Sequence, residues 1–250
     1  MRVLCKVSYD GSMYYGFQKQ NNKVTIQGTI EEAIKKITKE DIAIHASGRT
    51  DAKVHAYGQM FHFDSSLNMN ESNWLHALNS LLPHDIRINK VFFVEDDFHA
   101  RFNVKRKNYI YKMNLGDYNL FERKYITQFN KDLNLESLNE ATELFLGTHD
   151  FRNFCSNNEE NMDYIRTIYS IDISKKNRYL EFSFVGTGFK KYMIRMIVGT
   201  IIAYSTNKID LDYISNRLDI VEFNTTQFNA KPEGLYLNKV IYERDDIDED

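Results

Sequence analysis

The hydrophobic pattern of this chain switches repeatedly between a period of two and a period of about 3.6 residues, and this switching limits the folds that it can adopt. Alternating apolar and polar residues predict half-buried strands, whereas apolar residues at i, i+3, i+4 and i+7 predict amphipathic helices. Thr25 is placed to cap the first helix, whose apolar stripe runs from Ile30 to Ile37. The other predicted helices span 73–82, 135–146 and 189–204, and the predicted strands span 3–9, 42–46, 57–63, 86–94, 109–113, 165–173, 179–185 and 235–242.

The order of these elements is β-α-β-β-α-β, followed by a second such series, which is typical of a duplicated split-βαβ arrangement. Consecutive strands then pair mostly antiparallel, and the helices pack on one face. We therefore predict an α+β fold of two similar halves that share an antiparallel sheet, with the active cleft between the halves. The predicted halves span 1–105 and 106–242, and we expect the acidic tail at 243–250 to be disordered.

The composition predicts a soluble, cytoplasmic protein with a sizeable core. Of the 250 residues, 42% are hydrophobic and 14% are aromatic, whereas disordered chains are poor in aromatic residues. No apolar run approaches the roughly 18 residues of a membrane span, and the N-terminus has no signal-peptide core, so we expect no membrane partner. Cys5 and Cys155 are the only cysteines, so we expect reduced thiols.

The charge is distributed unevenly along the chain. The net charge is −3, but the tail contains six acidic residues and one arginine, which leaves 31 basic and 29 acidic residues in the other 242. Residues 100–115 and 186–209 contain no acid, and basic and aromatic residues alternate within them. Such segments are typical of an RNA-binding surface, although two ordinary solvated faces would have the same composition. The candidate RNA-binding residues are Arg101, Lys190 and Lys191.

The loop from Ser47 to His55 lies between two predicted strands and contains the candidate catalytic group. Asp51 is ionised at neutral pH without assistance, and in a desolvated cleft it could act as a nucleophile or a general base. The alternative is a structural turn in which Asp51 bonds its own backbone beside an exposed Arg49.

Two residues of the second half could complete this site. Arg195 lies in an apolar helix without an acid, and a buried guanidinium needs a carboxylate, for which Asp51 is a candidate. The alternative is that Arg195 faces solvent. Tyr109 and Tyr111 share one face of a strand and could stack on a base, or pack in the core. We expect no metal or nucleotide cofactor, because the histidines lack ligand spacing and no glycine-rich phosphate loop is present.

Six segments, in order, are similar to motifs of the tRNA pseudouridine synthase A family. They are 9–20, 48–59, 97–102, 109–111, 193–199 and 233–237, and the resemblance extends over nearly the whole chain, from about residue 2 to 242.

The resemblance implies a homodimer of chains with two α+β halves, which isomerises uridine to pseudouridine in the anticodon stem-loop of tRNA (positions 38–40) without metal or cofactor. By motif, Asp51 is the catalytic aspartate, Tyr109 contacts the target base, Arg195 pairs with the aspartate and Arg49 helps to hold RNA. One position departs from the family pattern: Lys53 stands where glycine is usual. A positive φ would strain this lysine, or its charge could contact phosphate.

Two rival functions remain. A non-catalytic RNA-binding protein with tandem RNA-recognition-like modules would have the same fold and basic segments, but it would not need an ionised aspartate beside a buried arginine. A metal-dependent hydrolase would need a carboxylate or histidine cluster, which the sequence does not show.

Overall fold

The computed structural model describes residues 1–156, 162–220 and 222–248. The chain divides into two compact units, Met1–Lys107 with Tyr236–Asp250, and Asn108–Leu235. Among the described residues no helix is both long enough and apolar enough to span a bilayer.

The strands of the first unit are arranged in the order β4-β1-β3-β10. The central pairs, β1 with β3 and β1 with β4, are antiparallel, whereas β10 runs parallel to β3 through the partners Tyr236 with His55 and Leu237 with Ala56. A short β2 also pairs with β3. The bounds are β1 Arg2–Tyr9, β2 His45–Ala46, β3 His55–Asp64, β4 Ile86–Val94 and β10 Leu235–Ile241.

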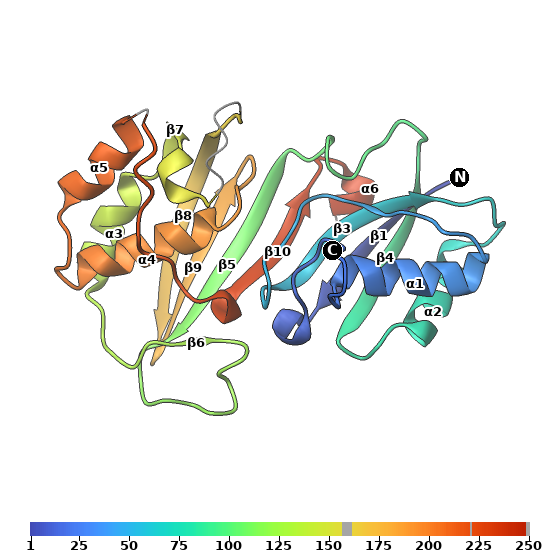
Figure 1. Cartoon of the computed structure of the whole chain (residues 1–250), viewed down its shortest axis with the longest axis horizontal. Helices are drawn as coiled ribbons and strands as arrows, with labels where there is room; N and C mark the ends of the chain where they lie inside the picture. The colour runs from blue at the N-terminus through green and yellow to red at the C-terminus, as the bar shows by residue number, and fades with distance from the viewer. Residues whose placement is uncertain (157–161, 221, 249–250) are drawn as a thin grey trace. The chain divides into compact units, whose positions relative to one another are not determined.

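Two helices cover the strands of the first unit, and their ends follow from local sequence. The hydroxyl of Thr25 accepts a hydrogen bond from the Gly28 N–H (3.3 Å) at the start of α1 (Ile26–Thr38), which lies in front of the strands in Figure 1. Helix α2 (Glu71–Leu81) stops two residues before Pro83 and packs on β4. Trp74 in α2 is fully buried and meets Phe63 of β3 edge to face.

The strands of the second unit follow the order β5-β9-β8-β7, with β6 parallel to β5. The pairs β8 with β9 and β7 with β8 are antiparallel. Helices α3 and α4 contact each other, and α4 lies in front of β8 and β9 in Figure 1. The bounds are β5 Arg106–Asn114, β6 Thr127–Gln128, β7 Gly147–Asp150, β8 Ile165–Lys176, β9 Tyr179–Gly186, α3 Leu135–Glu143, α4 Met193–Ser205 and α5 Leu211–Asp219.

The predicted α+β class is confirmed, and each predicted helix and strand is present, with differences at some bounds. The helix expected from residue 189 begins only at Met193, because Tyr192 has a left-handed backbone (φ +65°). The strand expected over 42–46 is limited to His45 and Ala46. Elements β6, β7 and α5 were not predicted, so the second series is longer than a plain repeat of the first.

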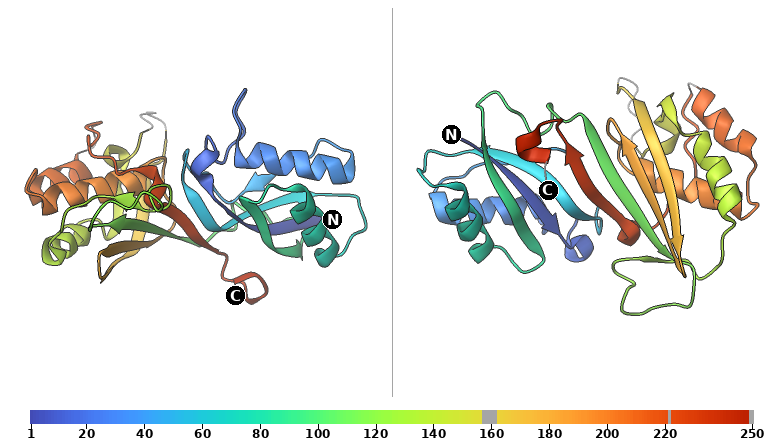
Figure 2. Two further views of the ribbon diagram at one scale, coloured as in Figure 1. Left: turned by 90° about the horizontal axis from the view of Figure 1, so that it is seen from below. Right: turned by 180° about the vertical axis from the view of Figure 1, so that it is seen from behind.

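The division of the chain differs from the predicted halves. The first segment of the first unit ends at Lys107 rather than at residue 105. Strand β10, which was expected in the second half, belongs to the first unit from Tyr236 onward, where it pairs with β3. Figure 2 shows β10 from two further directions.

The expected disorder of the tail does not hold for residues 243–248, and residues 249–250 lie outside the described part of the chain. Asp245–Asp248 form the short helix α6, and Ile247 is buried. Arg244 binds Glu95 (2.7 Å) and Asp246 (2.8 Å), so charges that would repel one another in a free tail are partly paired.

Candidate active site

The candidate catalytic residue Asp51 occupies the first position of a tight turn between β2 and β3. The turn is closed by a hydrogen bond from the Val54 N–H to the Asp51 carbonyl (3.2 Å). Its third residue, Lys53, has φ +67°, whereas its second, Ala52, is not among the residues with positive φ. This is the pattern of a type II turn. Asp51 is half-buried, and Arg49 beside it is exposed.

The segment from Tyr9 to Phe17 holds this turn from the N-terminal side. The Phe17 N–H donates to the Thr50 carbonyl (3.0 Å), and the Lys53 N–H donates to the Tyr14 carbonyl (3.3 Å). Two glycines allow the close approach. A Cβ at Gly16, whose φ is +91°, would lie 2.8 Å from the Thr50 carbonyl oxygen, and a Cβ at Gly11 would lie 2.0 Å from that of Val54.

Buried polar side chains fix the start of the loop. Tyr9 and Thr50 share a hydrogen bond between their hydroxyls (2.8 Å), and burial raises the pKa of the Tyr9 phenol, so that it stays neutral. Gln59 receives a hydrogen bond from the Ser47 hydroxyl and donates one to the Gly48 carbonyl (3.0 Å). Lys107 donates to the Ser47 carbonyl (2.7 Å) and therefore has a structural role, although it lies in an acid-free basic segment.

The other end of the loop is fixed by His55, a residue to which the sequence assigned no role. Its Nδ1 accepts a hydrogen bond from the Gly11 N–H (3.2 Å) and lies 3.3 Å from the Asp10 carboxylate. Its ring stacks on Tyr236 of β10 at 4.6 Å, and Tyr236 stacks on Tyr57 at 5.0 Å. The loop is therefore held by β10 as well as by the N-terminal segment.

The two tyrosines of β5 have different surroundings. Tyr111 is fully buried, and its hydroxyl bonds Thr127 and the Lys231 carbonyl, each at 2.8 Å, so that it belongs to the core. Tyr109 is 7% exposed and meets Phe189 edge to face at 5.4 Å. Packing therefore fixes both rings, and the expected contact of Tyr109 with a base stays a prediction.

Arg195 is half-buried and tied to the loop that precedes β10. Its Nε donates to the Ala230 carbonyl (2.7 Å), the Ala230 N–H donates to the Arg195 carbonyl (2.9 Å), and the guanidinium lies 4.8 Å from the centre of the Tyr192 ring. These contacts lie within the second unit. The expected pairing with Asp51, which belongs to the first unit, stays a prediction.

The candidate RNA-binding residues lie at the surface of both units. Arg101 and Lys191 are exposed, and Lys190 is partly exposed. The lysine ammonium groups lie over aromatic rings: that of Lys190 is 5.4 Å from the centre of Tyr164, and that of Lys191 is 5.3 Å from Tyr192. Cation–π contacts of this kind restrict a lysine without neutralising its charge.

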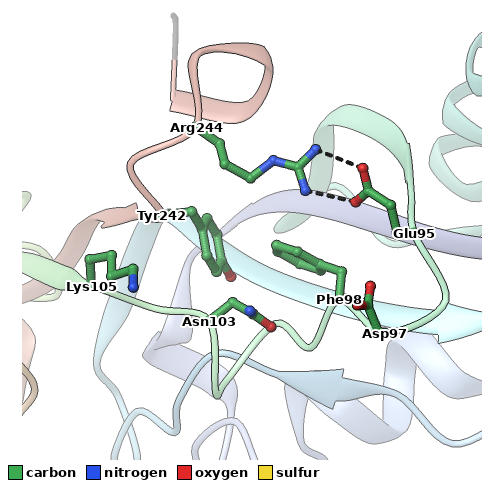
Figure 3. Close-up of a pocket in the computed structure, with 7 residues that line it drawn as sticks. All are labelled: Glu95, Asp97, Phe98, Asn103, Lys105, Tyr242 and Arg244. Atoms are coloured by element: carbon green, nitrogen blue, oxygen red, sulfur yellow. Dashed lines mark hydrogen bonds and ion pairs between the residues drawn. The ribbon is translucent and has the colours of Figure 1, made fainter.

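A pocket of about 150 Å³ lies in the first unit, but it contains no residue of the loop that carries Asp51 (Figure 3). It lies where the tail meets the segment after β4, and the pair of Arg244 with Glu95 closes one side. Within the described ranges, no group of three or more His, Cys, Asp or Glu side chains is placed to hold a metal ion. The lining residues are Glu95, Asp97, Phe98, Asn103, Lys105, Tyr242 and Arg244.

Among solved structures, the chain resembles one titled "Crystal Structure of a Cbf5-Nop10-Gar1 Complex" at 12% identity and a TM-score of 0.36. The similarity covers 80% of this chain and 54% of that one.

Sequence relatives agree with the motif resemblance. The family model of tRNA pseudouridine synthase matches residues 6–103 and 141–243. The chain is 41% identical over 244 residues to tRNA pseudouridine synthase A of Geobacillus sp. (strain WCH70), covering 97% of this chain and 98% of that protein. It is 40% identical over 246 residues to the enzyme of the same name from Bacillus licheniformis, with 97% and 100% covered. With both matches extending over most of its length, the chain belongs to the tRNA pseudouridine synthase family.

Proposed function

We propose that this chain isomerises uridine to pseudouridine in the anticodon stem-loop of tRNA, at positions 38–40, with Asp51 as the catalytic carboxylate. Family membership supports the reaction and the class of substrate. The observation that supports Asp51 is its turn, which is held by the 9–17 segment and by β10. A structural turn in which Asp51 bonds only its own backbone would not need contacts from two segments that are distant in the sequence.

The reaction breaks the bond between ribose C1′ and N1 of the base and joins C1′ to C5, from which a proton leaves. An ionised Asp51 could attack C1′, attack C6 of the base, or remove a ribose proton. Each route needs a carboxylate held at a fixed position, since a displacement of about 1 Å can cost about a hundredfold in rate. The proposed chemistry uses side chains alone.

The target base must leave its stack before it can react, at a cost of a few kcal/mol. We assign to Tyr109 the contact with the flipped base and to Arg195 the pairing with Asp51, on the strength of the motifs that contain them. The roles of Arg49, Arg101, Lys190 and Lys191 would be to hold the phosphate backbone, which their surface exposure allows. A homodimer would present these groups twice. Light scattering tests for the dimer by comparing the mass of the particle in solution with the 29.5 kDa of one chain.

The experiment that tests the proposal uses tRNA carrying tritium at uridine C5. The wild-type chain should release tritium to water, Asp51→Asn should release none, and its tRNA affinity should stay within a few fold of wild type. Asp172→Asn is the matched control, because this exposed carboxylate lies in β8 of the other unit and should be replaceable without effect.

Other outcomes would exclude the proposal. Release near the wild-type rate by Asp51→Asn would exclude this carboxylate as the catalytic group. Binding without release by the wild-type chain would indicate an RNA-binding module, and shortened RNA would indicate a hydrolase.

A further inference from the structure

We propose that Lys53 binds a phosphate of the tRNA backbone next to the target uridine, and that the chain keeps a lysine in a strained turn for this contact. The inference rests on the proposed function of Asp51, two residues earlier. Lys53 is the third residue of the turn Asp51–Val54, with φ +67°.

The backbone conformation of Lys53 does not favour lysine. A left-handed φ brings the Cβ of an L-residue close to its own backbone, and type II turns select glycine or asparagine at the third position for this reason. Among the described residues, asparagine occupies four of the seven other non-glycine positions with positive φ. A lysine at this position therefore reduces stability, and strained residues of this kind are concentrated at functional sites. The four asparagines with positive φ are Asn22, Asn130, Asn177 and Asn207.

Lys39 provides an internal comparison. It also has a left-handed backbone (φ +65°), at the end of α1, and its ammonium donates to the Lys36 carbonyl (3.0 Å). Its side chain therefore contributes a hydrogen bond near the helix end. Lys53 has no such role: it is exposed, and the structure shows no hydrogen bond or ion pair of its side chain with any described residue.

The charge of Lys53 lies where a phosphate would come. Arg49 and Lys53 flank Asp51 at equal distances along the chain, and both are exposed. A nucleotide whose sugar reaches Asp51 brings its phosphates beside this loop, because phosphate and sugar alternate along the RNA backbone. A lysine suits this role as a flexible point charge that needs no planar geometry.

The experiment measures the equilibrium affinity for tRNA against NaCl concentration in Lys53→Gln and Lys53→Arg. Loss of one phosphate contact should reduce the log–log slope by about 1 and the affinity at about 0.15 M salt by about fivefold. Lys53→Arg keeps the charge and should therefore keep the wild-type salt slope and the wild-type affinity. Lys39→Gln is the matched control, because it removes the same charge from the same backbone conformation at the C-terminal end of α1 and should change neither the slope nor the affinity.

A second pair of variants tests the strain. Lys53→Gly should raise Tm by about 2 °C, since glycine adopts the left-handed region freely. Lys39→Gly should raise Tm less, because it also removes the hydrogen bond to the Lys36 carbonyl, and only Lys53→Gly should weaken tRNA binding. An unchanged salt slope in Lys53→Gln, or an equal loss in Lys39→Gln, would overturn the phosphate contact. These binding measurements need no turnover. A chain that shows the Lys53 effect but releases no tritium would therefore disprove the proposed function and leave the phosphate contact of Lys53 supported.

Discussion

Arg195 and Ala230 hold each other through two hydrogen bonds, one from the arginine Nε to the Ala230 carbonyl and one from the Ala230 N–H to the Arg195 carbonyl. The first bond fixes the side chain near its head group, and the second fixes the backbone of the loop that leads into β10. A Cβ at Gly199, one helical turn later, would lie 2.9 Å from the Asn229 nitrogen, so that α4 and this loop are packed without space for a side chain. Arg195 is therefore pre-positioned by its own unit.

Arg195→Lys should lower kcat by about 10- to 100-fold with a smaller change in KM. Lysine has no donor at the Nε position and cannot make a planar two-point contact with a carboxylate. The tritium-release assay measures both constants. Arg87→Lys, at an exposed position of β4, is the control and should behave as wild type. Wild-type turnover in Arg195→Lys would show that the guanidinium geometry is not needed.

The predicted pairing of Arg195 with Asp51 has its own test. In a double-mutant cycle, the change in the free energy of unfolding for Asp51→Asn with Arg195→Met should differ from the sum of the single changes by about 0.5 kcal/mol or more. Additive values would exclude a direct pair.

Gly11→Ala should deform the turn that carries Asp51. The new Cβ would lie 2.0 Å from the Val54 carbonyl oxygen, a backbone atom that cannot rotate away. Overpacking of this kind costs about 1–3 kcal/mol, and displacement of Asp51 should also lower kcat by at least tenfold. Thermal unfolding and tritium release measure the two effects.

Gly28→Ala is the control for this substitution. Its Cβ would approach the Thr25 hydroxyl at 3.1 Å, and alanine favours the helix by about 1 kcal/mol, so stability should be unchanged or higher. Gly11→Ala with wild-type Tm and turnover would show that the N-terminal segment does not support the loop.

The sequence predicts best the elements whose signals are local. The strand predicted at 86–94 has those bounds in the structure, and the cap at Thr25 forms as expected, because alternation and capping depend on a few adjacent residues. The start of α4 was predicted too early, since the apolar and aromatic pattern continues through residues 189–192 while the backbone at Tyr192 turns left-handed. Strands as short as β6 and β7 contain too few residues to show a period.

In the candidate site, too, local features could be predicted from the sequence and tertiary contacts could not. The motif around Asp51 was recognisable, but the contacts that hold it were not, because they join residues far apart in the sequence. The fit of Gly11 against Val54 and the stack of His55 on Tyr236 depend on tertiary packing. Charge alone does not show that Lys107, within an acid-free basic segment, binds a backbone carbonyl of the loop. The positive φ that the sequence allowed as one possibility at Lys53 is present in the structure.

Acidification should destabilise the first unit through His62. Its side chain is buried, its Nδ1 accepts a hydrogen bond from the Ala100 N–H (3.1 Å), and burial lowers its pKa to about 4, with a further contribution from the charge of Arg2. The unfolded pKa is about 6.5, so the folded state binds fewer protons between these values. The stabilisation from neutral His62 is therefore complete above about pH 6.5 and is lost as pH falls toward about 4.

His62→Gln should flatten the pH dependence of Tm between pH 6.5 and 4, because glutamine does not titrate and its carbonyl can accept the Ala100 N–H. A smaller slope should remain, since burial also lowers the pKa of His99, whose ring centre lies 4.7 Å from that of His62. His84→Gln, at an exposed position, is the control. Equal slopes in wild type and His62→Gln would disprove the assignment.

Asp248→Ala should destabilise the first unit without affecting catalysis. The Asp248 carboxylate accepts hydrogen bonds from the N–H groups of Tyr242 and Arg244 (3.1 Å each), so that it joins α6 to the end of β10. Removing this acceptor from partly buried donors costs about 1–3 kcal/mol, which lowers Tm by about 2–4 °C per kcal/mol in a chain of this size. Asp245→Ala removes the same charge from an exposed position of the same helix and should change Tm little, whereas turnover should match wild type in both variants. If Asp248→Ala proves as stable as Asp245→Ala, the tail is attached by Ile247 and Arg244 instead, and the carboxylate of Asp248 contributes nothing to the fold.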